Sequence, residues 1–348
     1  MGRMLWAAAI AALVLPMAAQ AADQAPRPPK TGYHAPRTVD GHPDFEGVWT
    51  NASLTSLERP AMFKSLTITE AQARTMEQSR AKMRASGDKP SDPKEGAPPV
   101  ANDPGGYNAA WTDPGTTLGR INGQVRTSWL IEPANGQLPY SPEGKKIFDR
   151  VLKKARTDFG GPEIRPLGER CILGFGSTAG PPMLNVLYNN NYQIVQSPDQ
   201  VAIVVEMNHD VRTVRLNAKS HLPANVRPWM GDSIGHWEGE TLVVETTNFN
   251  PGESLRPYFG ATMYLSKDAK VTERFTRTSP TQILYQFEVN DPQIFSQVWK
   301  AEMPLNATKG PVYEYACHEG NYALPGILAG ARQAEKEGKA PEEIGLSE

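Results

Sequence analysis

The second half of the chain constrains the fold most, because it consists of β-rich runs separated by turn residues. From about residue 185 onward, eight runs of six to nine residues are rich in β-branched and aromatic side chains, and no helical pattern separates them. In the run "ILYQFEV", the side chains of Ile283, Tyr285, Phe287 and Val289 alternate with mostly more polar ones, which predicts one core face. Strands that follow one another this closely favour an antiparallel meander. We therefore expect a mainly β fold, an antiparallel β-barrel or sandwich with a few peripheral helices and long loops.

The chain divides into five segments around this pattern. They are a signal peptide (1–21), a Pro-rich leader (22–43), a loop- and helix-rich N-terminal part packing on the core (44–184), the antiparallel β core (185–322), and a C-terminal helix and tail (323–348). We expect the C-terminal helix to lie over the β core.

Two helices and one short strand are predicted in the N-terminal part. The strand contains Gly47-Val48-Trp49, and the first helix follows Thr69 in a mostly polar, exposed sequence. The second helix begins at Ser141-Pro142, which supplies an N-cap and a proline at the first helical position.

The N-terminal residues have the parts of a secretory signal peptide. Arg3 lies in a short n-region, an apolar stretch extends to about Met17, and Ala19-Gln20-Ala21 fits a cleavage site. The apolar stretch is short for a membrane span, and no other segment is long enough. We therefore expect a mature chain that is cut after Ala21, lies in the periplasm or is secreted, and does not insert into a membrane.

Charge and composition point to a small partner. The net charge is −2, and no Lys/Arg-dense face is present, which argues against nucleic acid. We expect a small-molecule ligand or substrate and no organic cofactor. Nothing in the sequence indicates an oligomeric state.

The chain has two cysteines, Cys171 and Cys317. Because an exported chain meets oxidising conditions, we expect them to form a disulfide.

The first candidate site is the hairpin "VAIVVEMNHDVRTVRL". If its loop is Asn208-His209-Asp210, then Glu206 faces Arg212 across the ladder, and the two must pair because an unpaired buried charge is costly. In the functional interpretation these residues line one end of a cavity, with His209 as general acid or base and Arg212 stabilising a developing oxyanion. In the structural interpretation they form an ion pair and a polar loop.

The second candidate site is "YEYACHEGNY", in which His318 and Glu319 directly follow Cys317. A disulfide would fix their backbone, as an acid–base pair requires. A purely structural corner would have the same sequence.

Metal binding and serine chemistry are two alternatives that the spacing disfavours. No His-x-His, His-x-x-x-His or His-Glu-x-x-His pattern occurs, so a metal would need ligands from separate loops. The stretch "GDSIG" fits the Gly-x-Ser-x-Gly pattern of hydrolases, but a hairpin around Trp237-Glu238-Gly239 follows it instead of a strand-to-helix elbow. We therefore interpret Ser233 as a structural residue, with Asp232-Ser233 forming an ordinary turn, and expect no metal. The side chains that would offer metal ligands are His209, Asp210, His221, His236, His318 and Glu319.

Aromatic side chains are candidates for holding a ligand. Trp237, Trp299 and Tyr313, together with Glu206, are the residues we expect to contact an organic ring or sugar. Core packing would explain the aromatic residues equally well.

Several motifs together resemble an uncharacterised family of exported bacterial proteins. The resemblance covers about 150 residues and implies export, but it brings no established activity. Gly47-Val48-Trp49 is also similar to the Gly-x-Trp that opens lipocalin barrels, which favours a barrel over a sandwich. The family motifs are Arg170-Cys171, Tyr192 to Gln196, Glu206 to Arg212, Gly231 to Val244, Glu273 to Arg277, and Tyr313 to Tyr322.

Two functional classes remain open at this point. The first is an extracytoplasmic acid–base enzyme without an organic cofactor, a lyase, isomerase or hydrolase acting on a small organic or sugar-derived substrate. In it His209 and His318 carry protons, Asp210 and Glu319 orient them, and Arg212 binds an anionic oxygen. The alternative is a periplasmic binding or carrier protein for an aromatic or lipidic ligand.

Overall fold

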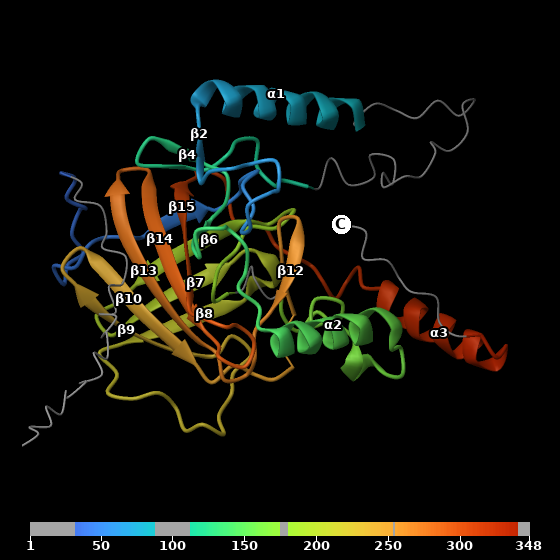
Figure 1. Ribbon diagram of the computed structural model, residues 1–348. Helices are drawn as coiled ribbons and strands as arrows, with labels where there is room; N and C mark the ends of the chain where they lie inside the picture. Colours follow the sequence, from blue (N-terminus) through green and yellow to red (C-terminus); the bar gives the residue numbers. More distant parts are fainter. Residues whose placement is uncertain (1–31, 88–111, 175–179, 253–254, 340–348) are drawn as a thin grey trace, which may run out of the picture.

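The computed structural model describes residues 32–87, 112–174, 180–252 and 255–339. The predicted signal peptide lies outside these ranges, and so do parts of the predicted leader, of the N-terminal part, of the β core and of the C-terminal tail. The fold is mainly β, with a closed barrel of nine strands and three α-helices in the described ranges (Figure 1). This confirms the predicted fold class, and it shows that the sheet is a barrel and not a sandwich.

Each barrel strand pairs with the next, and the first strand pairs with the last, which closes the sheet. A tenth strand, β5 (Leu130–Glu132), adds to the side of the last barrel strand. In barrel order the strands are β1 (Gly47–Thr50), β6 (Asn191–Gln196), β7 (Gln200–Val205), β8 (Val211–Leu216), β9 (Asp232–Glu238), β10 (Thr241–Thr247), β13 (Lys270–Ser279), β14 (Gln282–Asn290) and β15 (Trp299–Ala307).

Strands β8 and β9 are parallel, whereas every other neighbouring pair in the barrel is antiparallel. The expectation of an uninterrupted antiparallel meander was therefore wrong at this one place. The reason is parity, because a closed ring with an odd number of strands cannot alternate in direction all the way round. The strand β1, from the part that we expected only to pack on the core, brings the number to nine.

The barrel has two ends that differ in their connections. The tight turns β6–β7, β9–β10 and β13–β14 lie at one end, which we call the turn end. The β7–β8 loop, residues 206–210, lies at the other end, which we call the loop end. At the turn end, Thr241 pairs with Glu238, so that Gly239 and Glu240 form the predicted hairpin turn, and Gly239 has a φ of +59° that favours glycine.

The barrel interior is packed with large side chains. Ile283, Tyr285, Phe287 and Val289 of β14 are all buried, which confirms the core face predicted from their alternation. They form one cluster with Trp49 of β1 and with other residues of the barrel strands. This apolar core holds the barrel together.

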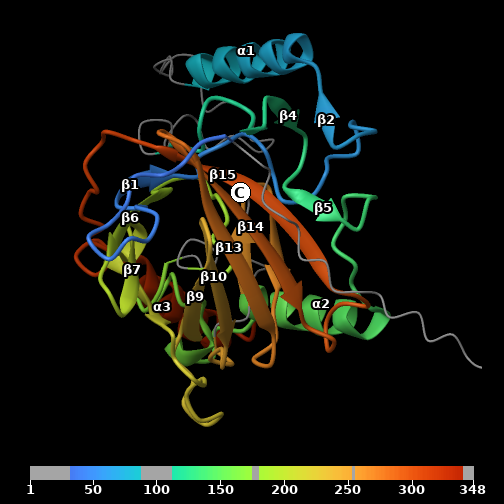
Figure 2. The same cartoon turned by 90° about the vertical axis from the view of Figure 1, so that its left-hand side faces the viewer.

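Two smaller sheets flank the barrel. A three-stranded sheet consists of β2 (Thr67–Ile68), β4 (Gln124–Arg126) and β3 (Arg120–Ile121), and a hairpin joins β11 (Leu255–Tyr258) to β12 (Ala261–Tyr264). Helix α1 (Glu70–Gly87) packs on the three-stranded sheet through Ala73, beside Val125, and is otherwise largely exposed, as predicted. Figures 1 and 2 both show α1 on the opposite side of the barrel from the other two helices.

Helix α2 (Pro142–Thr157) begins where the sequence predicts. The Ser141 side chain accepts a hydrogen bond of 2.9 Å from the Gly144 amide, and Pro142 is the first helical residue. A single 3-10 turn, Pro162–Ile164, follows the helix.

Helix α3 (Ala323–Lys336) does not lie over the barrel, so that expectation was wrong. Arg332 donates to the carbonyl oxygens of Phe159 and Gly160, just after α2, and Ala331 is the buried residue of the helix. Figure 1 shows α3 beside α2 and extending away from the strands. Within the described ranges, no helix combines the length and the apolar character needed to cross a membrane.

Candidate functional site

The β7–β8 loop at the loop end adopts a register different from the predicted one. Val204 pairs with Val211 and Ile203 pairs with Arg212, so Glu206 does not face Arg212. A 3-10 turn, Met207–His209, widens the loop, and Asn208 and His209 both have positive φ values, 63° and 50°. Glu206 therefore leaves the ladder.

The side chains of this loop bind the backbone of the motif "YEYACHEGNY". The Tyr313 amide donates to Glu206 Oε1 at 3.1 Å, and the Tyr315 amide donates to His209 Nε2 at 2.9 Å. Asn191 Nδ2 donates to the other Glu206 oxygen at 2.8 Å. Because His209 Nε2 accepts a hydrogen bond, the imidazole is neutral in this contact and carries its proton on Nδ1.

Asp210 faces a third segment of the chain. Its Oδ2 accepts a hydrogen bond of 3.1 Å from the Gly174 amide. Burial raises the pKa of this half-buried carboxyl to about 6, although the hydrogen bond from the Gly174 amide acts to lower it. A carboxyl group with this pKa exchanges protons near neutral pH, which an ordinary aspartate does not do.

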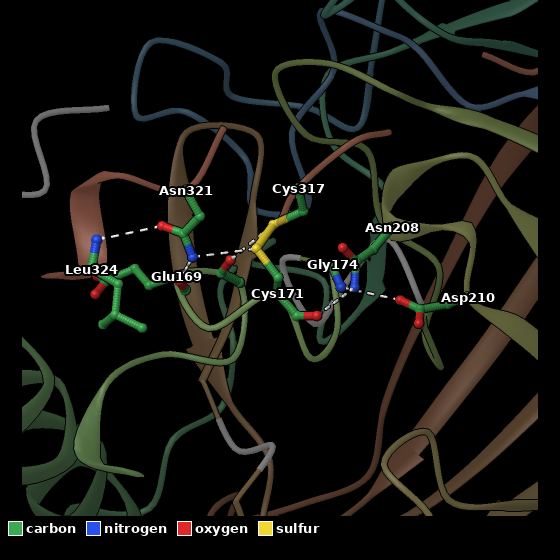
Figure 3. Close-up of a disulfide and its surroundings, with 9 residues drawn as sticks. Glu169, Cys171, Gly174, Asn208, Asp210, Cys317, Asn321 and Leu324 are labelled. Atoms are coloured by element: carbon green, nitrogen blue, oxygen red, sulfur yellow. Dashed lines mark hydrogen bonds between the residues drawn. A yellow bond between two sulfur atoms is a disulfide. The ribbon is translucent and has the colours of Figure 1, made fainter. Parts of the chain in front are cut away.

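A disulfide joins the two segments that reach the loop. Cys171 and Cys317 are bonded, with an S–S distance of 2.02 Å, which confirms the predicted pair. Figure 3 shows the disulfide between Asn321 and Asn208, with Gly174 and Asp210 beside it. Asn208 Nδ2 donates to the Cys171 carbonyl oxygen at 3.4 Å. The loop 206–210 and the segments 167–174 and 313–321 thus form one unit.

His318 and Glu319 follow the disulfide directly and are exposed. They therefore lie in the same unit as His209, because the Tyr315 amide binds His209 and the Cys317 amide binds the Tyr315 carbonyl oxygen. In the described residues, no side-chain hydrogen bond fixes the imidazole of His318 to Glu319.

Two tyrosines that are not among the predicted site residues belong to the same region. Tyr188 and Tyr315 share a side-chain hydrogen bond, and both are partly buried against the barrel core. Burial raises the pKa of Tyr315, although the hydrogen bond from Tyr188 acts to lower it. The alternation of Tyr313 and Tyr315 indicates an extended segment, but no local signal connects Tyr315 with Tyr188.

Arg212 lies inside the barrel rather than at its mouth. Its guanidinium is paired with both Glu273 oxygens, and Arg212 Nε donates to Ser233 Oγ at 3.0 Å. Two further hydrogen bonds complete this network. Arg212 Nη2 donates to Thr246 Oγ1 at 3.0 Å, and the Tyr285 hydroxyl donates to Glu273 Oε1 at 2.7 Å. Arg212 is 2% exposed, and its charge is already neutralised by Glu273.

Ser233 belongs to this interior network and lies within the strand β9. Its Oγ is 2.8 Å from Thr246 Oγ1, and Ser233 itself is buried. Histidine is not among its hydrogen-bond partners in the described residues. Asp232 and Ser233 begin the strand β9 and do not form the predicted turn.

The three candidate aromatic residues lie in different places. Trp299 is fully buried and packs edge-on against Phe287 and Phe295. Trp237 lies at the turn end, away from loop 206–210, and is stacked on His42 at a centroid distance of 5.0 Å. Tyr313 is 65% exposed and borders the loop. Of the three, Tyr313 is the one that contacts loop 206–210, through Glu206.

The remaining candidate metal ligands do not gather. His221 lies between Asp232 and Glu245, and His236 is an exposed residue at the turn end. Across the part of the chain that the structure describes, no group of three or more His, Cys, Asp or Glu side chains has a metal-binding arrangement.

The chain matches no model of a known protein family, and it has no significant match among curated proteins or solved structures.

Proposed function

We propose that the protein is an extracytoplasmic acid–base enzyme whose site is the unit formed by loop 206–210 and the two disulfide-linked segments. The single observation behind this proposal is that this unit brings together an aspartate, two histidines and two tyrosines on a covalently fixed backbone. Proton transfer needs groups held in place, and a disulfide beside a short loop supplies that rigidity.

Asp210 is the proton carrier in this proposal. Its carboxyl is half-buried and titrates near pH 6, so both protonation states are populated under mild conditions. The Gly174 amide holds one of its oxygens and fixes the direction of the carboxyl group. His318 and the Tyr188–Tyr315 pair are the second proton donors or acceptors within the same unit.

The roles of His209 and Glu206 are to hold Tyr313 and Tyr315. In the contact with Tyr315, the Nε2 atom of His209 is already in use, which leaves Nδ1 for substrate. Arg212 and Trp299 are enclosed by the barrel, so we do not include them in the substrate site. The substrate class remains a small organic or sugar-derived compound, to which the exposed Tyr313 ring offers a stacking surface.

The experiment is a comparison of Asp210→Asn with Asp199→Asn after a substrate screen. Native mass spectrometry of the protein purified from a periplasm identifies co-purifying compounds, and these compounds and their chemical relatives are then tested for turnover. We expect Asp210→Asn to abolish turnover while the protein stays folded. Asp199 is an exposed aspartate at the turn end, so its variant should retain full activity. Equal activity of the two variants would contradict the proposal.

A binding or carrier function is the second candidate, and one observation favours it. Asn51 Oδ1 and Trp299 Nε1 are buried and have no hydrogen-bond partner among the described residues. A ligand or ordered water inside the barrel would satisfy such atoms. A stoichiometric organic molecule that is bound but never converted would support this function over the enzyme.

Export belongs to the proposal as well. The disulfide is compatible with an oxidising compartment, and the N-terminal sequence predicts a signal peptide cut after Ala21. Sequencing the N-terminus of the mature protein tests the cleavage, and cell fractionation tests the periplasmic location. Membership of the uncharacterised exported family stays a prediction.

A further inference from the structure

The seam between the parallel strands β8 and β9 is paired over a shorter length than β8 itself. Strand β8 extends from Val211 to Leu216, but its ladder with β9 begins only at Val214, which pairs with Ser233. On its other side, β8 pairs with β7 from Val211 onward. Among the residues that the structure describes, the stretch from Val211 to Thr213 therefore has a neighbouring strand on one side only.

Hydrogen bonds at both ends of the β7–β8 ladder show which backbone groups of β8 face the seam. The Asp210 carbonyl oxygen accepts a hydrogen bond of 2.8 Å from the last residue of β7, and the Leu216 amide donates to the Asp199 carbonyl oxygen at 2.8 Å. Because backbone groups alternate in direction along a strand, the even-numbered residues of β8 bond to β7, and the odd-numbered residues face the seam. The Asn217 amide, which donates to the Gly235 carbonyl oxygen of β9 at 2.8 Å, follows the same alternation.

Three backbone groups of this edge have no hydrogen-bond partner within the described ranges. The Thr213 carbonyl oxygen faces the Ser233 amide, where the β8–β9 ladder begins. The Thr213 amide and both backbone groups of Val211 face the same side ahead of that ladder, and no hydrogen bond reaches them from the described residues. Val211 is 51% exposed, and Thr213 is exposed as well. The seam is thus an open strand edge with two donors and one acceptor.

A turn at Gly231 keeps the chain before β9 from pairing with this edge. Gly231 has a φ of +72°, and its amide donates to the Pro228 carbonyl oxygen at 3.1 Å, so the chain turns directly before β9. A Cβ atom at Gly231 would lie 2.7 Å from the Thr247 carbonyl oxygen, which places the turn against the end of β10. Because β10 lies on the other side of β9 from β8, residues 228–231 do not continue the β8–β9 ladder.

The outward side chains of this edge favour pairing with another strand. Exposed edges in natural proteins usually carry lysine, proline or a bulge that prevents such pairing. Here the outward residues are Val211 and Thr213, which are β-branched and uncharged, while Arg212 between them points into the barrel and pairs with Glu273. Val211 lies opposite Val204 of β7 on the outer face. An apolar side chain on an added strand would therefore pack beside Val211.

We propose that the edge from Val211 to Thr213 binds an extended peptide segment of a partner protein, which adds to the barrel sheet as a short strand. A peptide main chain satisfies the two donors and the acceptor with two carbonyl oxygens and one amide, whichever direction it runs. The peptide residue beside Val211 carries an apolar side chain. This inference concerns a binding surface and does not rest on the proposed chemistry of Asp210.

The first test measures hydrogen exchange of the β8 amides by NMR in dilute, oxidised protein. We expect the Val211 and Thr213 amides to exchange at least about tenfold faster than those of Arg212 and Val214, which donate to β7. A Thr213 amide that exchanges as slowly as that of Arg212 would show that the edge is covered and would overturn the proposal. Slow exchange that appears only at high protein concentration, together with a dimer in sedimentation, would identify a second copy as the occupant and would overturn it too.

The second test titrates the protein with a probe peptide of alternating threonine and valine, with a lysine at each end for solubility. We expect saturable chemical-shift changes centred on the Val211 and Thr213 amides, and slower exchange of both. A peptide of the same sequence with N-methylated amides lacks the main-chain donors and should not bind. If the unmethylated probe leaves these two amides unchanged, the edge does not take a peptide.

Three variants locate the binding of the probe. Thr213→Pro removes an amide that faces the seam and leaves the β7–β8 hydrogen bonds in place, so we expect the dissociation constant of the probe to rise about tenfold or more. Val211→Lys puts a charge on the edge and should also weaken binding, which keeps the test available should Thr213→Pro fail to fold. The matched control is Val195→Lys, at a valine of β6 that is 44% exposed in a strand with neighbours on both sides. Equal affinities of the two lysine variants would contradict the proposal.

Discussion

The substitution Glu273→Gln should destabilise the barrel far more than its small change in shape suggests. Glu273 is fully buried, and its two oxygens are paired with the guanidinium of Arg212, which is 2% exposed. Its Oε1 also accepts a hydrogen bond of 2.7 Å from the Tyr285 hydroxyl. The substitution leaves the Arg212 charge inside the barrel without a counter-charge, although Ser233 and Thr246 still accept hydrogen bonds from it.

The expected loss follows from the cost of an unpaired buried charge. Removing one partner of a buried ion pair costs about 3–5 kcal/mol of the free energy of unfolding. For a chain of this size, each kcal/mol lowers the melting temperature by about 2 °C, so Glu273→Gln should lower it by roughly 6–10 °C. Urea unfolding followed by tryptophan fluorescence measures the free energy directly, since buried tryptophans such as Trp49 and Trp299 report on the barrel.

Two further variants serve as controls for this prediction. Replacing both partners, as Arg212→Met with Glu273→Leu, removes the charge together with its partner and should restore stability to within about 1–2 kcal/mol of wild type. Asp149→Asn breaks an exposed ion pair with Lys145 and should change stability by less than about 0.5 kcal/mol. If Glu273→Gln costs no more than Asp149→Asn, or if the double variant is less stable than the single one, the interior pair does not act as described.

Three other predictions concern the backbone and the site. Cys317→Ser should lower the melting temperature of the oxidised protein, because the disulfide closes a loop with a sequence separation of 146. On the chain-entropy model such a disulfide stabilises the fold by up to about 4–5 kcal/mol. If reductant left the wild-type melting curve unchanged, this prediction would be wrong. Gly144→Ala should destabilise the protein by about 2 kcal/mol or more, because the new Cβ would lie 1.9 Å from the Ile294 carbonyl oxygen, and thermal melting measures the loss. Asp210→Asn should stabilise the protein above about pH 6 and have little effect well below it, because folding favours the protonated carboxyl group and charging it opposes folding; equal effects in melting curves at both pH values would refute the raised pKa.

Local patterns were sufficient to predict the strands and helices that depend on neighbouring residues. The alternation along β14 identified its core face, and Ser141 with Pro142 located the start of α2. The parallel pairing of β8 with β9 depends instead on the number of strands in the closed ring. That number includes β1, a four-residue strand more than 130 residues before β6. Its Gly-x-Trp favoured a barrel, but so short a strand gives too little local signal to predict its partners β6 and β15.

The predicted hairpin register failed for a different reason. A three-residue loop would have placed Glu206 opposite Arg212, but positive φ values at Asn208 and His209 allow a wider loop. The partner of Arg212 shifts by three residues to Ile203, an odd number, and an odd shift moves the intended partner off the shared face. The opposite charges of Glu206 and Arg212 do not impose the predicted register, because Arg212 pairs with Glu273 inside the barrel instead.

The same loop shows why the motif Glu-x-x-His-Asp-x-Arg could not be divided into structural and chemical residues from sequence. All four side chains are polar and closely spaced, yet Glu206 and His209 bind backbone amides, while Arg212 enters the core. Only Asp210 combines partial burial, a raised pKa and a partner amide in a segment held by the disulfide. The partner amide belongs to Gly174, in a segment more than thirty positions away in the chain. The chemistry of Asp210 therefore depends on the tertiary fold as well as on the loop, and a variant that removes the Gly174 amide contact should raise the pKa of Asp210 further.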